Sequence, residues 1–420
     1  MIDEIRRLRN AREYEKAWIE IQKIKNFFDP EPEPESETNL DLLFETSIVN
    51  FYLLSSQKLP MDIFFKRVLI PLLNSDNESY KKQTLKNLKY YLNSQTLNIT
   101  NKYDFSKTFQ AMARNKLDTF YHTNPCIFKF GDNYGLNIRC VNYSIMPNGV
   151  YKMLDDTLVT LNKFFILDKE SFKPILDSES NPGKILNIQM PTPSQTTIQG
   201  NILGYEDMRI FHQSKSKSDS DSESESESEY LTTGSHLLDN KIRIITGAFL
   251  KDTENVLIEK IWDTAKPVEK NWVYLNKDYL IYQWYPNPVL IQRNTGQVIE
   301  CTLEKPLPKF FQLLKGSTCA QFIEETNEYW IGVHFNNDTV PRVYYNMILV
   351  FEFSEQLTIT SIRLKRYSLP FKFYEFGNIE FYLGMIVEPE KDRIVFSASQ
   401  NDNSANVYVC DIHSIKFVDV

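Results

Sequence analysis

The chain has 420 residues, of which 42% are hydrophobic and 13% aromatic, so it is long enough to bury a sizeable core. Its formal net charge of −8 at pH 7 argues against a nucleic-acid partner. No apolar run approaches the roughly 20 residues of a membrane-spanning helix, and the charged start lacks the apolar centre of a signal peptide. Five scattered cysteines without a CxxC pair are typical of a reducing compartment. We therefore expect an intracellular protein with no membrane span.

Residues 1–95 carry the periodicity of α-helices. Apolar side chains recur at helical spacing over residues 14–24 and 40–52, a third helix follows Pro60, and a fourth fits residues 81–92. Short helices with apolar stripes predict a small helix-pair, repeat-like domain that could dock a protein partner.

Two segments have compositions that favour disorder. Residues 29–38 (DPEPEPESET) alternate proline with acids, and residues 213–229 form a run of serines and acids. The second run reads either as a neutral loop expansion or as a substrate for acid-directed kinases.

From about Thr123 the apolar period becomes two, in strand-length runs bounded by Gly, Pro, Asn and Asp. The lack of crossover helices excludes a doubly wound α/β fold. Aromatic-rich hairpins recur in five segments, which favours a propeller over a large sandwich or two β domains. We predict a mainly β protein in which a helical domain and a linker, residues 96–122, precede a five-bladed β-propeller over residues 123–420.

The stretch GYEDMRIF, residues 204–211, places charged residues in a predicted strand. Strand alternation puts Asp207 and Arg209 on one side and Glu206 on the other. Such a pair forms either a cross-strand salt bridge or one wall of a functional cleft.

Other predicted strands carry polar side chains in the same way. Asn137 and Arg139 share one face of LNIRCVNY, Lys270 and Trp272 alternate with Asn271 in EKNWVYL, and YQWYP adds Trp284. Charged groups rarely enter strands unless they are paired or functional. Their proximity to aromatic residues predicts a polar cleft with stacking platforms, the usual composition of a sugar site.

Metal and cofactor chemistry is not predicted. His334 is a lone strand histidine, and no group of His, Asp or Glu has ligand spacing. Phosphate-binding glycine loops, GxSxG and Cys-His signatures are missing from the sequence.

The order of several short motifs resembles a known family. The chain is similar to the five-bladed β-propeller proteins related to inverting β-mannoside phosphorylases, and to glycosyltransferase-associated propeller proteins of large DNA viruses and some bacteria. Several of these relatives have a helical repeat before the propeller. The resemblance covers about residues 124–420 and rests on NPCI (124–127), LNIRCVNY, GYEDMRIF, EKNWVYL, YQWYP, KGST (315–318), VHF (333–335), LPFKF (369–373), IEFYLG (379–384) and SASQNDNSA (397–405).

The resemblance implies roles for individual residues. Asp207 matches the aspartate that acts as proton donor through the sugar, and Arg209, Lys270 and Asn271 match positions bordering the sugar and an anion. An inverting mechanism needs a donor on one face of the anomeric carbon and an attacking group on the other, with cations stabilising the anion. The full set of expected substrate-binding residues is Asn137, Arg139, Glu206, Arg209, Lys270, Asn271, Trp272, Trp284, His334, Tyr344, Glu380 and Asp402.

The chain departs from the family at two places. Asn346 and Met347 stand where relatives have a polar pair that includes a cation, and Phe335 follows His334 where relatives often have an acid. Three hypotheses stay open: an enzyme transferring a hexose from a sugar phosphate or nucleotide sugar, a non-catalytic propeller binding glycans or proteins, and a structural protein with a degenerate site.

Overall fold

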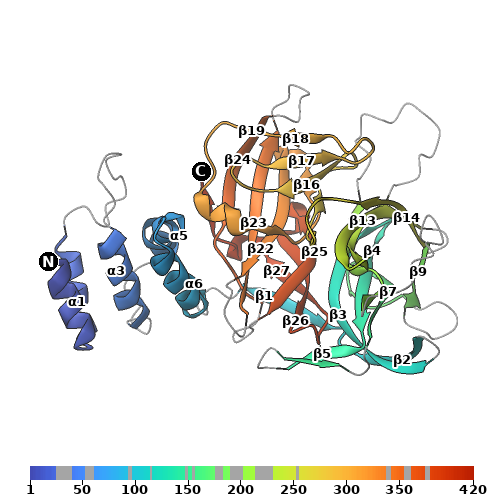
Figure 1. The fold of residues 1–420 in the computed structure, drawn as a ribbon, viewed down its shortest axis with the longest axis horizontal. Helices are drawn as coiled ribbons and strands as arrows, with labels where there is room; N and C mark the ends of the chain where they lie inside the picture. Colours follow the sequence, from blue (N-terminus) through green and yellow to red (C-terminus); the bar gives the residue numbers. More distant parts are fainter. Residues whose placement is uncertain are drawn as a thin grey trace.

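The computed structural model describes residues 1–24, 40–52, 61–92, 97–113, 116–146, 150–153, 157–175, 183–189, 202–212, 230–251, 255–336, 342–353, 361–373 and 379–420. A row of helices precedes a large, mainly β part (Figure 1). The segments predicted to be disordered, 29–38 and 213–229, lie outside the described residues.

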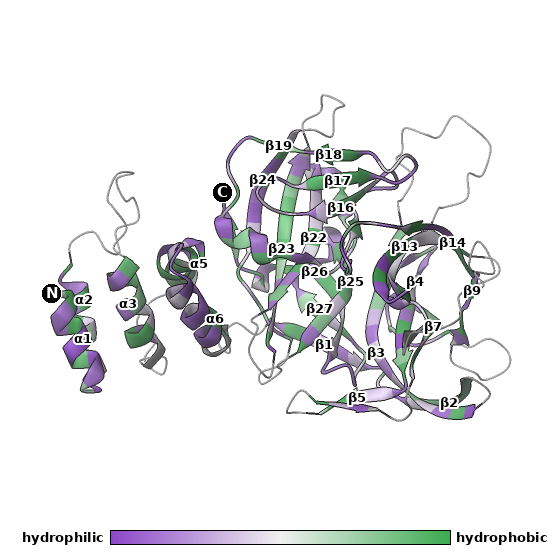
Figure 2. Ribbon diagram, viewed as in Figure 1, coloured by the Kyte–Doolittle hydropathy of each residue, from purple (hydrophilic) through white to green (hydrophobic). Residues whose placement is uncertain are grey.

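The helices confirm the predicted periodicity. The structure has α1 (Ile2–Asn10), α2 (Tyr14–Gln22), α3 (Leu40–Tyr52), α4 (Met61–Phe64), a π-helical turn (Phe65–Leu69), α5 (Ile70–Asn74) and α6 (Glu78–Leu92). Hydrophilic residues cover much of α1 and α6, whereas the strands of the β part contain hydrophobic stretches (Figure 2). In the described part of the chain, none of the helices has the length and hydropathy to cross a membrane.

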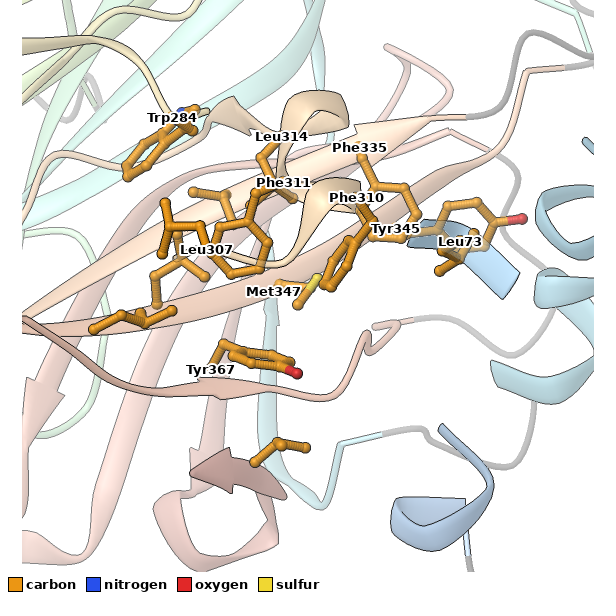
Figure 3. Close-up of a cluster of buried hydrophobic side chains, with 14 of the residues drawn as sticks. Leu73, Trp284, Leu307, Phe310, Phe311, Leu314, Phe335, Tyr345, Met347 and Tyr367 are labelled. Carbon is orange, nitrogen blue, oxygen red and sulfur yellow. The ribbon is translucent and has the colours of Figure 1, made fainter. Parts of the chain in front are cut away.

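α3 and the helices after it share a core with the β part. Leu73 lies near Phe310, Phe335 and Tyr345 in one cluster of buried side chains (Figure 3). The Asn74 side chain accepts a hydrogen bond from the Phe310 backbone N–H (2.9 Å), and the Tyr345 hydroxyl donates to a helix carbonyl (2.9 Å). Burial of this apolar surface, rather than a flexible tether, holds these helices against the β part.

The strands form five sheets of four or more strands within the described residues, numbered here in chain order. The first sheet contains β2 (Thr108–Ala113), β3 (Lys116–Phe130), β4 (Asn133–Val141), β7 (Leu158–Leu167), β8 (Lys184–Ile185) and β10 (Ile202–Leu203). The second contains β9 (Asn187–Gln189), β11 (Glu206–His212), β12 (Tyr230–Leu238), β13 (Lys241–Leu250) and β14 (Asn255–Trp262).

The remaining sheets complete the β part. The third contains β15 (Val273–Tyr274), β16 (Tyr279–Gln283), β17 (Val289–Gln292) and β18 (Val298–Glu300). The fourth contains β19 (Thr302–Leu303), β20 (Lys315–Gly316), β21 (Gln321–Ile323), β22 (Glu328–Asn336), β23 (Tyr344–Phe353), β24 (Ser361–Ser368) and β28 (Phe417–Asp419). The fifth contains β1 (Ile99–Asp104), β25 (Glu380–Glu388), β26 (Arg393–Gln400) and β27 (Asn406–Asp411), and β5 (Tyr143–Ile145) pairs with β6 (Tyr151–Met153) as a separate ribbon.

The predicted linker, residues 96–122, is a strand region instead. It contains β1, β2 and the start of β3, and β1 pairs antiparallel with β27 from the other end of the chain. The partner of β1 lies about 300 residues away in sequence, whereas β2 forms a local hairpin with β3. Both strands are largely exposed and lack a long apolar run, so they give a weak strand signal.

Hydrogen bonds join each sheet to the next. In chain order, these bonds run from Ile210 N to Cys126 Sγ, from Thr233 Oγ1 to Trp272 O, from Ala320 N to Tyr274 O, from Tyr382 OH to Val333 O, and from Ile127 N to Ser397 Oγ. The last bond returns from the fifth sheet to the first. The arrangement is therefore propeller-like, with mainly antiparallel sheets linked one to the next in a closed circuit.

Close approach of two inner strands requires a glycine at position 384. A Cβ built on Gly384 would lie 2.2 Å from the Ile127 backbone nitrogen of β3. Gly384→Ala is expected to lower the free energy of unfolding by about 1–3 kcal/mol, because a backbone must shift to admit the methyl group. Urea denaturation measures this loss, and an unchanged midpoint would show that β3 and β25 do not pass so closely.

Candidate functional site

Polar side chains from separate sheets meet around one buried arginine. We call this group the polar cluster and define it as Asn124, Arg139, Tyr143, Glu206, Asp207, Lys270 and Asp402. β3 and β4 supply the first two, the β5–β6 ribbon supplies Tyr143, and β11 supplies Glu206 and Asp207. Lys270 precedes β15, and Asp402 lies in the turn between β26 and β27.

Arg139 lies at the centre of the cluster, and only 5% of its side chain is exposed. Its Nη1 lies 2.9 Å from Asp207 Oδ1, and its Nη2 lies 2.8 Å from Glu206 Oε1. Nη2 also contacts the Tyr143 hydroxyl at 3.3 Å. One guanidinium therefore compensates two buried carboxylates, which would be costly to bury alone.

The remaining bonds extend the cluster to the other sheets. The Tyr143 hydroxyl donates to Asp402 Oδ2 (3.1 Å), and Asn124 Nδ2 donates to Asp207 Oδ1 (2.9 Å). Lys270 Nζ lies 3.4 Å from Glu206 Oε2 and is the more exposed cation, at 38% of its side chain. The cluster thus reaches solvent on the Lys270 side.

A bulge in β11 makes both acids face Arg139. The pairing of β11 with β12 shifts register between Glu206 and Arg209, and Asp207 has a positive φ of 51°. The strict alternation predicted for this strand is therefore wrong, because a bulge turns one extra side chain to the same side.

Several residues in and beside the cluster have a left-handed backbone conformation. Besides Asp207, positive φ angles occur at Asn124 (40°), Asn271 (67°), Asn401 (51°) and Asp402 (49°). Asn and Asp tolerate this region better than other residues with a Cβ, although it still costs energy. The same conformation occurs in turns elsewhere, as at Asp239 and Asn240, so it shapes the cluster without identifying it as a site.

The surroundings displace the pKa values of Asp207 and Asp402 in opposite directions. Burial alone would raise the pKa of Asp207, but Arg139, Lys270, Arg209 and the Asn124 hydrogen bond together lower it below its ordinary value. Burial raises the pKa of Asp402, against the opposing effect of Arg139. Burial also raises the pKa of Tyr143, so its hydroxyl stays a donor.

Arg209 does not form the alternative salt bridge with the Asp207 carboxylate. Its Nε donates to Ser317 O (2.6 Å), and its Nη2 donates to Asn271 Oδ1 (3.0 Å) and Gly316 O (3.2 Å). Its Nη1 donates to the backbone oxygen of Asp207 (3.0 Å). Arg209 and Asn271 therefore tie three sheets together next to the polar cluster.

The two predicted stacking tryptophans belong to the core. Trp272 is 1% exposed, with its indole N–H donating to Glu269, and Trp284 packs against Phe351. The aromatic ring that is exposed near the cluster is Tyr151, which lies 5.4 Å from the Tyr143 ring and is 53% exposed.

Three further predicted ligands are buried among protein partners. His334 Nδ1 lies 2.8 Å from Ser317 Oγ, Asn137 donates to Asn162 Oδ1 (3.1 Å), and Glu380 accepts the Phe373 N–H (2.8 Å). The Tyr344 ring stacks on His334 at 5.4 Å. Within the described residues, no group of His, Cys, Asp or Glu could hold a metal ion.

Asn346 and Met347, the two positions that differ from the polar pair of the resembling family, have different surroundings. Asn346 is fully buried opposite His334 in the β22–β23 register, whereas Met347 is buried in the core shared with the helices. Strand alternation places only Asn346 on the side of His334, and Met347 on the opposite side.

Sequence reasoning did not select Asn124, Tyr143 and Tyr151. Asn124 precedes Pro125, a turn signal within a strand that marks the register shift of β3. Tyr143 lies four residues after Arg139, across a strand break that a simple alternation rule does not reveal.

The far end of β11 lies beside a small cavity. This cavity has a volume of about 60 Å³, and residues of β3, β11 and β25 line it, among them Lys129, His212 and Ile386. A space of this size admits water rather than a sugar ring.

No protein-family model matches the chain, and no curated protein matches it. Among solved structures, a mannose phosphorylase from Leishmania mexicana in complex with phosphate aligns at 11% identity and a TM-score of 0.42, covering 80% of this chain and 96% of that one. A GDP-Man-dependent mannosyltransferase from the same organism aligns at 12% identity and a TM-score of 0.35, covering 70% and 86%. A GH43_1 enzyme from Xanthomonas citri complexed with xylose aligns at 6% and 0.39, covering 73% and 89%. These likenesses are too distant to assign a substrate or a reaction.

Proposed function

We propose that the protein is a glycan-active enzyme that transfers a hexose at the polar cluster, and that its five sheets are the blades of a five-bladed propeller. The observation that carries the proposal is the pair Asp207 and Asp402, joined through Arg139 and Tyr143, whose pKa values are displaced in opposite directions. Two carboxyl groups with separated pKa values supply an acid and a base at the same pH.

The opposite pKa displacements suggest which aspartate acts as the acid and which as the base. Asp402 retains its proton to a higher pH, so it protonates the oxygen of the leaving group. Asp207 stays ionised, so it accepts the proton of the attacking hydroxyl on the other face of the sugar, as an inverting reaction requires. This assignment differs from the family expectation, in which Asp207 is the proton donor.

A second candidate function is non-catalytic binding of a neutral glycan. Arg139 is engaged by two carboxylates, and Arg209 is engaged by backbone oxygens and Asn271. Of the three cations of the predicted site, Lys270 alone has a substantially exposed side chain. This arrangement favours a ligand without phosphate.

The test is a screen of nucleotide sugars and sugar 1-phosphates with oligosaccharide acceptors, followed by mass spectrometry of the products. Wild-type protein is expected to form a glycosylated product, and Asp402→Asn is expected to lower the rate about 100-fold or more, the contribution of a general acid. Saturable glycan binding without any product would favour the second candidate.

Glu388→Gln is the matched control, because Glu388 is a buried carboxylate that also contacts an arginine and a tyrosine hydroxyl, Arg393 and Tyr134. Its rate should equal that of the wild type. If Asp402→Asn keeps full turnover, the acid assignment is wrong.

A further inference from the structure

A second cavity of about 350 Å³ lies between the first and fifth sheets and shares no lining residue with the polar cluster. Its volume falls within the range of small-molecule pockets. Its lining comes from β1, the β1–β2 connection, β3, β7 and the turn after β7, and consists of Lys102, Tyr103, Asp104, Phe105, Lys107, His122, Lys163, Phe165, Phe172, Lys173 and Pro174.

The apolar part of the lining is aromatic. Phe105, Phe165 and Phe172 are each less than a tenth exposed, and Tyr103 stacks on Phe172 with ring centroids 4.9 Å apart. Tyr134 also stacks on Phe172, with ring centroids 5.4 Å apart, so that ring already has its stacking partners. The rings of Phe105 and Phe165 remain as the surface on which another planar ring can pack.

One buried polar atom in this lining is unsatisfied. His122 Nδ1 lies 2.7 Å from Phe105 O and must donate to it, since a carbonyl only accepts. The other ring nitrogen, Nε2, is then an acceptor, and it is buried without a hydrogen-bond partner among the described residues. Burial lowers the pKa of His122 to about 4, so the ring is neutral at pH 7. An orphan acceptor next to a cavity invites a donor from a ligand.

The charged part of the lining is cationic. Four lysines and one aspartate, Asp104, give a local charge of +3 in a chain whose net charge is −8. Asp104 Oδ1 accepts the Ser106 backbone N–H at 2.7 Å. Lys163 is half-buried, and its ammonium lies over the rings of Phe109 and Phe165, at 5.1 and 5.3 Å, of which Phe165 lines the cavity.

We propose that this cavity binds a small phosphorylated aromatic compound of the mononucleotide type. Its planar ring would pack on Phe105 and Phe165, an amino group of the ring would donate to His122 Nε2, and its phosphate would contact Lys163 and the neighbouring lysines. A sugar is a poorer fit, because the buried part of the lining offers one free acceptor for several hydroxyls. The proposal is independent of the proposed function of the polar cluster.

Calorimetric titration of the full chain with AMP tests the proposal. AMP is expected to bind at one saturable site with a dissociation constant below about 1 mM, and Lys163→Met is expected to weaken binding at least 10-fold. Ribose 5-phosphate and inorganic phosphate should bind at least 10-fold more weakly than AMP, since they lack the ring. His122→Phe keeps the ring packing but removes the acceptor, and it should weaken AMP more than ribose 5-phosphate.

Lys260→Met is the matched control. Lys260 is also half-buried over an aromatic ring, 3.8 Å from the centre of Trp262, but it lies on β14 away from this cavity. AMP affinity should be unchanged in this variant. No saturable AMP binding, equal binding of ribose 5-phosphate, or equal losses in the two lysine variants would overturn the proposal. Unchanged thermal unfolding of each variant establishes that lost affinity is not lost folding.

Discussion

Replacing Arg139 by methionine is expected to lower the free energy of unfolding by about 3–5 kcal/mol at pH 7, because it leaves buried carboxylates without their cation. Arg139 pairs with Glu206 and Asp207 at 2.8 and 2.9 Å, and their side chains are only 10% and 14% exposed. The second cation near them, Lys270, contacts Glu206 at 3.4 Å and cannot replace both bonds. Urea denaturation monitored by tryptophan fluorescence measures the loss.

A triple variant separates the effect of the uncompensated charges from the effect of lost packing around Arg139. Adding Glu206→Gln and Asp207→Asn to Arg139→Met removes the uncompensated charges, so the triple variant should recover part of the lost stability. If the triple variant is no more stable than Arg139→Met alone, the two carboxylates do not depend on Arg139 in the way described.

The variants Asp207→Asn and Asp402→Asn are expected to change stability with opposite signs. The lowered pKa of Asp207 adds stability to the native state above the ordinary pKa of an aspartate, and this contribution is lost as the pH falls through the folded-state value. Asp207→Asn should therefore cost about 1.5–3 kcal/mol at pH 6–8, the worth of a hydrogen bond to a charged group, and less in acid.

The raised pKa of Asp402 acts in the other direction. The native state binds this proton more tightly than the unfolded chain, so wild-type stability falls as the pH rises from the ordinary value through the folded-state value. Asp402→Asn removes this loss, and its stability relative to wild type should increase with pH by about 1.4 kcal/mol for each unit of pKa displacement. Urea titrations from pH 4 to 8 measure both trends. If the stability of Asp402→Asn relative to wild type does not increase with pH, the raised pKa assigned to Asp402 is wrong.

Much of the fold follows from local patterns. The run KIRIITGAFL (residues 241–250) forms β13, and the run YYNMILVFEF (residues 344–353) forms β23. An apolar period of two bounded by turn residues is largely sufficient to predict a strand. β1 was missed because its partner β27 is distant in sequence and its positions are mostly exposed. β2 forms a local hairpin with β3, but its exposed positions also give little apolar signal.

The candidate site was predictable only in part. Charged residues inside strands pointed to Arg139, Glu206 and Asp207, and the structure brings all three together. The alternation argument failed at the bulge after Glu206, since a single inserted residue reverses the faces that follow. Trp272 and Trp284 look identical to stacking residues in sequence, and only tertiary packing places them in the core.

The most direct measurement of the central claim is an NMR titration of the aspartate side-chain carboxyl carbons in selectively ¹³C-labelled protein, with the signals assigned through Asp207→Asn and Asp402→Asn. The account predicts that Asp402 titrates above, and Asp207 below, the ordinary value for an aspartate. Two ordinary titrations, or the reverse order, would contradict it and remove the acid and base on which the proposed sugar chemistry depends.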